Sequence, residues 1–128
     1  MNNCIFCKIV KGEVPCVKIF EDKDYFVFLD HNPLQTGHTL VLPKKHTDYI
    51  FDLKDVEYKE LMLKAKDIAN NLRLKLKSKR IGLIVEGFGV AHVHVHLVPI
   101  NHQYELDLIH KKSATNNELD KIAKIILG

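Results

Sequence analysis

The sequence feature that most constrains the fold is a strictly alternating run, HVHVHLV, at residues 92–98. In a β-strand alternate side chains share a face, so His92, His94 and His96 would stand in one row at steps of about 6.5–7 Å. In a helix a step of two residues would turn His94 away from its neighbours, and the β-branched valines also favour a strand. The run therefore predicts a strand with three imidazoles on one face and apolar side chains packed into the core behind them.

The apolar pattern elsewhere predicts an α+β domain with a roughly five-stranded antiparallel sheet, one long helix and short N- and C-terminal helices. Strands are expected at 17–21, 25–29, 39–42, 81–85 and 93–100. Helices are expected at 5–11, closed by Gly12, from 55 to about 78, and from residue 116 or 117 onward. The long helix carries one continuous apolar stripe made of Leu61, Ala65, Ile68, Leu72 and Leu76.

Length and composition indicate one ordinary globular domain spanning residues 1–128. The chain is 46% apolar and 27% charged, and at this size it needs no framework of several disulfides. No apolar run approaches the roughly 20 residues of a membrane span, and Lys8 and Lys11 follow too soon for a signal peptide. A net charge of +3, carried mainly by lysines, does not indicate a nucleic-acid groove. We therefore expect a cytoplasmic protein without membrane or nucleic-acid partners.

Three imidazoles on a rigid strand favour chemistry near neutral pH. Imidazole is a nucleophile, a general acid or base, and a metal ligand. A loop with two glycines, at 86–91, precedes the run, and backbone amides of such a loop can hold an anion. The residues alone leave three alternatives open: nucleophilic catalysis at phosphorus, a metal held by three histidines, and plain surface histidines.

Three blocks of the sequence match one family pattern in order. The run at 92–98 has the form His-φ-His-φ-His-φ-φ, where φ is apolar. An upstream block consists of FLD at 28–30, Pro33 and GHTLVLPKKH at 37–46. An N-terminal segment consists of CIFCKIVKGE at 4–13. Together they resemble the histidine triad (HIT) family of nucleotide hydrolases and transferases. The resemblance covers residues 4–100 and implies an HIT-like fold, with 101–128 as a C-terminal extension that ends in a helix.

The resemblance implies a role for each matching residue. His94 would be the nucleophile that attacks the α-phosphorus of a purine nucleotide and forms a nucleotidyl-histidine. His96 would bond phosphate oxygens and help the leaving group depart, while His38 would lie against the same phosphate. Asp30 would accept hydrogen bonds from the ribose hydroxyls. The residues expected around the purine base are Phe6, Val14 and Phe28, and the amides expected at the phosphate are those of Gly87, Phe88, Gly89 and Val90.

Plainer interpretations of several of these residues stay open. His38 could be a buried histidine at a strand end, and Asp30 a turn residue. Phe6, Val14 and Phe28 could simply belong to the core. The remaining histidines have no place in the family pattern, and we expect a surface or loop position for His31, His102 and His110.

The two N-terminal cysteines indicate metal binding more than redox chemistry. The pair Cys4-x-x-Cys7 lacks the βαβ context of a redox motif, and a structural disulfide is not expected in the cytosol. Zinc-binding relatives use two such cysteines with two histidines, which the resemblance places at His46 and His92. Four protein ligands close a zinc site, so this zinc would be structural. Cys16 is expected to be an inert apolar residue.

The loop before the triad departs from the branch of the family that acts on nucleoside phosphoramidates. Only residues 88–91 separate Glu86-Gly87 from His92, and the Gly-Gln-Ser-like stretch of that branch is absent, as is its C-terminal tryptophan. The sequence therefore leaves the leaving group open among phosphoramidates, adenylate adducts and dinucleoside polyphosphates.

Three kinds of function are compatible with these observations. The first is a zinc-containing nucleotide hydrolase or nucleotidyl transferase with His94 as nucleophile, which the motifs favour. The second is a hydrolase whose catalytic zinc is held by His38, His94 and His96. The third is a nucleotide-binding regulatory or partner protein with incidental hydrolysis. The resemblance also implies a homodimer, with the long helix and an edge strand at the interface.

Overall fold

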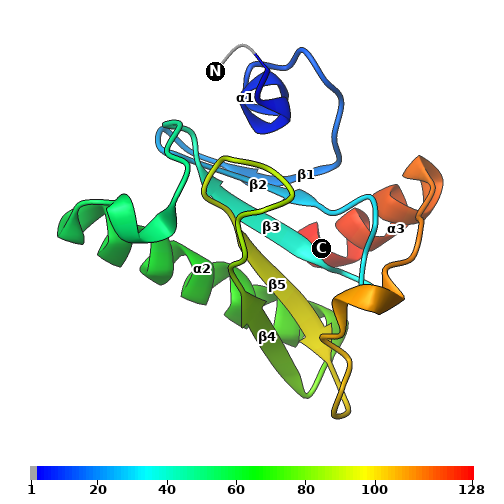
Figure 1. The fold of residues 1–128 in the computed structure, drawn as a ribbon. Helices are drawn as coiled ribbons and strands as arrows, with labels where there is room; N and C mark the ends of the chain where they lie inside the picture. Colours follow the sequence, from blue (N-terminus) through cyan, green and yellow to red (C-terminus); the bar gives the residue numbers. More distant parts are fainter. Residues whose placement is uncertain (1–2) are drawn as a thin grey trace.

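A computed structural model describes residues 3–128, which form one antiparallel sheet with helices on both faces (Figure 1). The strands are β1 (Lys18–Glu21), β2 (Tyr25–Leu29), β3 (Thr39–Pro43), β4 (Arg80–Ile84) and β5 (Val95–Ile100). The helices are α1 (Ile5–Val10), α2 (Asp55–Leu76) and α3 (Asn116–Leu127), with short 3-10 turns η1 (Ile50–Asp52) and η2 (Leu108–His110). The strand order is β1-β2-β3-β5-β4, and every neighbouring pair is antiparallel. The expected α+β class and sheet are confirmed.

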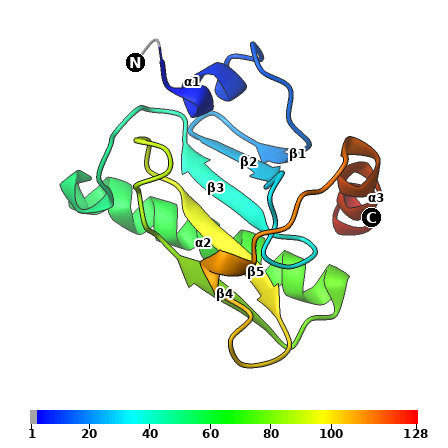
Figure 2. The ribbon, with the colours of Figure 1, turned by 45° about the vertical axis from the view of Figure 1, so that its right-hand side comes forward.

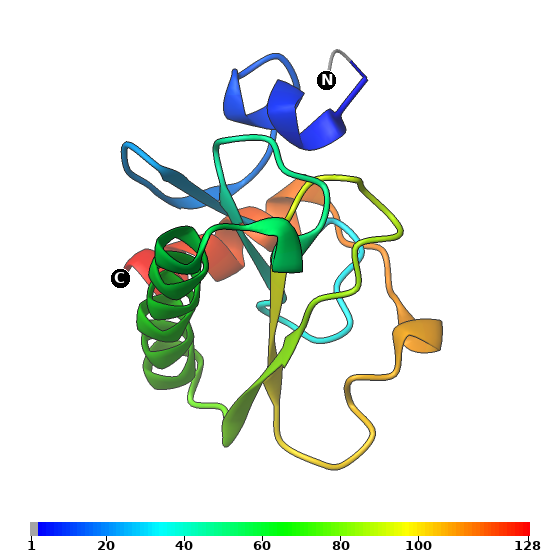
Figure 3. The same ribbon diagram turned by 60° about the vertical axis from the view of Figure 1, so that its left-hand side comes forward.

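The sheet separates two apolar clusters, which explains why all five residues of β2 are buried. Odd-numbered β2 residues such as Val27 join α2 and α3 in the larger cluster, while Phe26 and Phe28 join α1 in the smaller one. Figure 3 shows α2 on one side of the sheet and the segment with η2 on the other. A strand covered on both faces must be apolar at every position, so β2 shows no alternation in its sequence.

The helices begin and end where local signals place them. The stripe residues Leu61, Ala65, Ile68 and Leu72 are all buried against the sheet. Thr115 caps α3 by accepting a hydrogen bond from the amide of Glu118, whose carboxylate accepts one from the amide of Thr115. Gly12 ends α1 at a positive φ of 80°, as its position after the helix predicts.

The strand expected at 93–100 begins two residues later, at Val95. The reason lies in its partner, because β3 ends at Pro43, which has no amide to continue the ladder. The amide of Val93 instead donates to the carbonyl of Thr47 at 2.7 Å. The alternation nevertheless continues, since Val93, Val95 and Leu97 all pack into the larger cluster. None of the helices within residues 3–128 has the length and apolar character that crossing a membrane requires.

Candidate active site and metal centre

His94 lies under α1 with one ring nitrogen fixed. Its Nδ1 is 2.7 Å from the carbonyl oxygen of His92, so Nδ1 carries the proton and donates it. Nε2 therefore keeps a free lone pair. Burial lowers the pKa of His94, and the hydrogen bond to His92 only partly opposes this effect. A neutral imidazole with a free lone pair can act as a nucleophile at neutral pH.

His96 and His38 form a hydrogen-bonded pair whose proton positions follow from one backbone amide. The amide of Leu34 donates to Nδ1 of His38 at 3.0 Å, so the proton of the neutral His38 ring lies on Nε2. This Nε2 lies 2.9 Å from Nδ1 of His96 and donates to it. His96 consequently carries its own proton on Nε2. Burial, with smaller effects of His94 and His38, lowers the pKa of His96 to about 3, so His96 offers an N–H without a positive charge.

Asp30 stands beside this pair at the end of β2. One carboxylate oxygen accepts a hydrogen bond from the amide of Asn32 at 2.9 Å, which holds the side chain in place. The other oxygen lies 3.5 Å from Nε2 of His38. The side chain is 13% exposed, so part of the carboxylate remains accessible to a ligand. Burial lowers the pKa of His38 even though the Asp30 charge opposes this.

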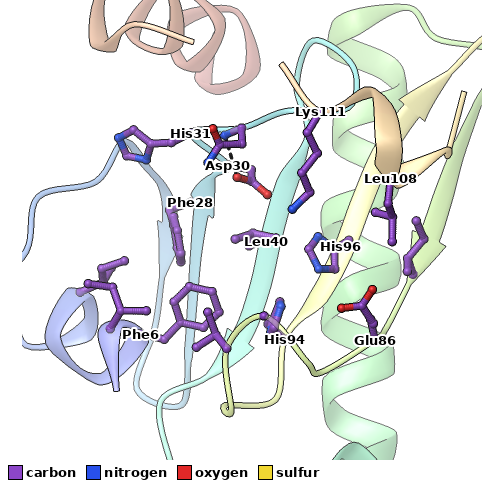
Figure 4. Close-up of a pocket in the computed structure, with 16 residues that line it drawn as sticks. Phe6, Phe28, Asp30, His31, Leu40, Glu86, His94, His96, Leu108 and Lys111 are labelled. Atoms are coloured by element: carbon purple, nitrogen blue, oxygen red, sulfur yellow. Dashed lines mark hydrogen bonds between the residues drawn. The ribbon is translucent and has the colours of Figure 1, made fainter. Parts of the chain in front are cut away.

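His94, His96 and Asp30 line a cavity of about 370 Å³ on the α1 face of the sheet (Figure 4). This volume is in the range of small-molecule sites. One end is apolar, with Phe6 of α1 set edge-on to Phe28 at a ring separation of 5.6 Å. Phe6 also lies edge-on to His94, with ring centres 4.8 Å apart. The cavity thus joins an apolar wall to a carboxylate and two neutral imidazoles.

The expected site residues differ in how close they come to this cavity. Phe6, Phe28, Asp30, Gly89, Val90, His94 and His96 line it, whereas Val14, His38, Gly87 and Phe88 are not among its lining residues. Val14 packs against the smaller cluster behind the apolar wall, and the Phe88 side chain is 92% exposed. Since both nitrogens of His38 have partners, its ring supports His96 from behind. The contacts favour a positioning role for His38, and direct contact of its ring with the phosphate stays a prediction.

A second group of ligand-type side chains converges beneath the N-terminus of α1. Nδ1 of His92 lies 3.4 Å from Sγ of Cys4 and 3.6 Å from Sγ of Cys7. Nδ1 of His46 lies 3.4 Å from Sγ of Cys7 and 3.2 Å from Nδ1 of His92. Zinc bonded to sulfur at about 2.3 Å and to nitrogen at about 2.05 Å in a tetrahedron requires edges of roughly 3.3–3.8 Å. The observed spacings therefore fit a tetrahedral zinc site.

The donor chemistry of this group also fits zinc. Nε2 of His92 donates to the carbonyl oxygen of Pro43 at 2.8 Å, which leaves Nδ1 without a proton and free to bind a metal. Sγ of Cys4, which caps α1, accepts a hydrogen bond from the amide of Cys7 at 3.4 Å. Thiolate and imidazole donors without an open position are typical of structural zinc.

Ligand-type atoms of Asp30, His38 and His96 also lie within 4.8 Å of one another. The 2.9 Å between the nitrogens of His38 and His96 is a hydrogen-bond distance, shorter than the roughly 3.3 Å between two nitrogens on tetrahedral zinc. His94 is not part of this group. The geometry fits the hydrogen-bonded pair better than the three-histidine metal site considered from the sequence.

Some cavity residues were not found from the sequence. Leu108 and Lys111 reach the cavity from the segment after β5, and Glu86 lines it from the loop after β4. Figure 2 shows η2 lying in front of β5. No motif marks residues 101–114, so only the path of the chain in space brings them here. His31 lies exposed at the cavity, and His102 and His110 are exposed, as expected.

Comparison with known proteins identifies one family. The HIT domain profile matches residues 11–103. An adenosine 5′-monophosphoramidase of Saccharomyces cerevisiae is 34% identical over 127 residues, which cover 95% of this chain and 77% of that protein. An adenylylsulfatase of Arabidopsis thaliana is 34% identical over 103 residues, which cover 77% of this chain and 52% of that protein.

Solved structures agree with the sequence matches. A HIT-like protein of Bartonella henselae superposes with a TM-score of 0.87 at 27% identity, covering 99% of this chain and 96% of that one. A zinc-bound histidine triad family protein of Mycobacterium smegmatis superposes with a TM-score of 0.84 at 26% identity, covering 98% and 91% of the two chains.

Proposed function

The chain belongs to the histidine triad family, and we propose that it is a hydrolase or nucleotidyl transferase acting at the α-phosphate of purine nucleotide derivatives. The observation that carries this proposal is the pair of fixed tautomers in one cavity. His94 presents a lone pair, and the neighbouring His96 presents an N–H. The relatives named as an adenosine 5′-monophosphoramidase and an adenylylsulfatase support a nucleotide substrate.

The proposed reaction has two steps. Nε2 of His94 attacks phosphorus, a P–N bond forms, and the bond to the leaving group breaks with its electron pair on that group, which takes up a proton from the solvent when it is an amine. The ring then carries a positive charge, which the hydrogen bond from Nδ1 to the His92 carbonyl stabilises. In the second step water attacks phosphorus, the P–N electrons return to Nε2, and the water proton passes to the solvent. Another nucleophile in place of water would make the reaction a nucleotidyl transfer.

The neighbouring groups stabilise the charge that develops on the phosphate oxygens. The N–H of His96 donates to an oxygen, and His38 fixes the tautomer and angle of His96, which makes it a positioning residue. The backbone amides at Gly87, Phe88, Gly89 and Val90 are candidates for further donors. Such preorganised donors stabilise the charge of the transition state most strongly in a site that excludes water.

Asp30 and the apolar wall supply the nucleoside contacts in this proposal. The accessible carboxylate oxygen of Asp30 accepts hydrogen bonds from the ribose hydroxyls. Phe6 and Phe28 pack against the purine base, and Val14 supports that wall from behind. Aromatic and aliphatic walls suit any nucleobase, so preference for a purine depends on the depth of this end of the cavity.

We propose that Cys4, Cys7, His46 and His92 hold a structural zinc ion. When bound, the ion would cross-link α1 to the segments before β5 and after β3. Because α1 also carries Phe6, this cross-link would hold the apolar wall of the cavity in position. The cytoplasm, where the two cysteines stay reduced, is the compartment that suits this site.

We also propose a homodimer that uses α2 and β4. β4 stands at the edge of the sheet, and the groove between it and α2 is apolar, with Leu63 61% and Leu83 44% exposed. Light scattering should give twice the chain mass, and Leu83→Lys should give the monomer. A wild-type monomer at assay concentration would contradict the dimer without affecting the proposed chemistry.

Hydrolysis of adenosine 5′-phosphoramidate and of adenylylsulfate tests the proposed activity. Wild-type protein should release AMP from at least one of them, and His94→Gly should lower kcat/KM by about a thousandfold or more, because the nucleophile is lost. His102→Gly, which changes an exposed loop histidine, is the matched control and should behave as wild type. Full activity of His94→Gly would contradict the proposal, and so would a chelator that abolishes turnover while the melting curve is unchanged.

A further inference from the structure

Among residues 3–128, Lys111 contributes the only lysine or arginine side chain to the cavity that holds His94 and His96. It follows η2, beyond the part of the chain that matches the family profile. Figure 4 shows the side chain reaching down from this segment, with its terminal nitrogen above Leu40, between the Asp30 carboxylate and His96. Burial is the main cause of the lowered pKa of His96, and the nearby charge of Lys111 adds a smaller effect in the same direction.

The backbone on the C-terminal side of Lys111 is fixed to the loop that follows Asp30. The amide of Lys112 donates to the carbonyl of Pro33 at 3.0 Å, and the amide of Ala114 donates to the carbonyl of His31 at 3.0 Å. These two bonds attach the segment to the same loop that orients Asp30. Lys111 is therefore held over the cavity by a defined path of the chain.

Lys111 gives the cavity a positive charge that an anionic ligand could pair with. Within residues 3–128, Lys111 forms no ion pair with a carboxylate. The other side chains with a full charge that line the cavity, Asp30 and Glu86, are carboxylates. A nucleotide phosphate would meet two carboxylates and no cation if Lys111 were absent.

We propose that Lys111 binds the phosphate oxygens of the nucleotide and supplies positive charge to a cavity whose other charged side chains are carboxylates. The proposal rests on the proposed function of the cavity. An ammonium ion binds a phosphate oxygen through a charge-assisted hydrogen bond, which is stronger than a neutral one. The extension after β5 thus takes part in ligand binding, and it lets the cavity distinguish a nucleotide from the nucleoside.

Calorimetric titration with AMP and with adenosine tests this role. Lys111→Met keeps the length of the side chain but removes its charge, so it should weaken AMP binding by about 10- to 100-fold and change adenosine binding less than about twofold. Lys111→Arg should keep AMP binding within about threefold, because the positive charge is retained. Lys112→Met is the matched control, since it changes the next lysine along the chain, which does not line this cavity, and it should bind both ligands as wild type does.

Each alternative result contradicts a particular claim. Unchanged AMP binding in Lys111→Met would overturn the role of Lys111. An equal loss of AMP and adenosine binding would also overturn it, because Lys111 would then support the segment and not the phosphate. If the charge-dependent AMP binding is found but no nucleotide is hydrolysed, the proposed function fails and the role of Lys111 in binding stands. Wild-type protein that binds no AMP would overturn both.

Discussion

The two ends of the histidine row use the same side chain in opposite ways. At the His92 end, Nε2 donates to a carbonyl, and Nδ1 faces two sulfur atoms and His46. At the other end, His94 donates from Nδ1 and keeps Nε2 free, while His96 accepts at Nδ1 and keeps its proton on Nε2. One histidine is suited to bind a metal, the next to attack phosphorus, and the third to donate a hydrogen bond.

This difference shows that the partner of the second nitrogen decides what each imidazole can do. Spacing along the strand places all three rings on one face, but hydrogen-bond partners determine their tautomers. The carbonyl of Pro43 fixes the tautomer of His92, the carbonyl of His92 fixes that of His94, and the ring of His38 fixes that of His96. Phe6 packs edge-on against both His92 and His94, so the two ends also share one wall. Variants that change one end and not the other can therefore test the division of roles.

The largest effect is expected from removal of a metal ligand. Cys7→Ser should bind less than one zinc per chain and melt about 10 °C or more below wild type, because loss of a structural metal is among the most destabilising changes. Zinc analysis and thermal melting with and without chelator measure this. Cys16→Ser, at the third cysteine, should keep the metal and melt near wild type. Equal behaviour of the two variants would contradict a zinc site at this end of the row.

The next largest effect is expected at the support of His96. His38→Ala removes the donor to Nδ1 of His96, so kcat should fall by about 30- to 100-fold, corresponding to about 2–3 kcal/mol. KM should change little, since His38 does not line the cavity. His38→Gln, whose amide can donate to His96, should recover part of kcat. A change confined to KM, or no recovery by glutamine, would argue that His38 contacts substrate directly.

Buried neutral histidines at the cavity end also predict a pH dependence of stability. The pKa of His96 is about 3 in the folded protein against 6.5 for an ordinary histidine. Between these two pH values His96 binds a proton in the unfolded chain but not in the folded protein. The free energy of unfolding is therefore highest above about pH 6.5. It falls as the pH drops below 6.5, by up to about 1.4 kcal/mol per pH unit.

Urea unfolding of wild type and His96→Gln at pH values from about 7 to 5.5 measures this effect. The wild-type free energy of unfolding should fall more steeply, and changes shared by both proteins, including metal loss, cancel in the difference. Parallel curves would show that His96 is not held neutral by the fold.

The smallest effect is expected at the wall that the two ends share. Phe6→Leu should raise KM for a nucleotide substrate by about three- to tenfold, because the aromatic contact with the base is lost. Zinc content should stay unchanged. Phe26→Leu alters another phenylalanine of the same cluster that does not line the cavity, so it should cost similar stability and leave KM as in wild type. If both variants raise KM equally, Phe6 acts through general packing.

Sequence pattern was enough to predict the sheet, the long helix and the convergence of two cysteines with His46 and His92. These features depend on periodicity and on a family motif whose residues stand close to strands. The start of β5 was misplaced by two residues, since the missing amide of Pro43 ends its partner strand. Apolar alternation continues through residues 93 and 94 and gives no sign of this.

The sequence did not reveal the roles that we propose for His38 and Lys111. The role of His38 depends on the amide of Leu34, which turns its ring into a donor toward His96. Lys111 is one of many lysines, and its segment is attached to the loop after Asp30 by backbone hydrogen bonds of Lys112 and Ala114. Contacts of this kind are made by the folded backbone and leave no local signature in the sequence.

Intact-mass analysis of the protein during turnover tests the central claim most directly. Wild-type protein mixed with adenosine 5′-phosphoramidate or adenylylsulfate and quenched under controlled pH should gain the mass of one adenylyl group. Fragmentation should locate the group on His94, and His94→Gly should show no gain. An adduct on another residue, or turnover with no adduct at any time point, would contradict His94 as the nucleophile.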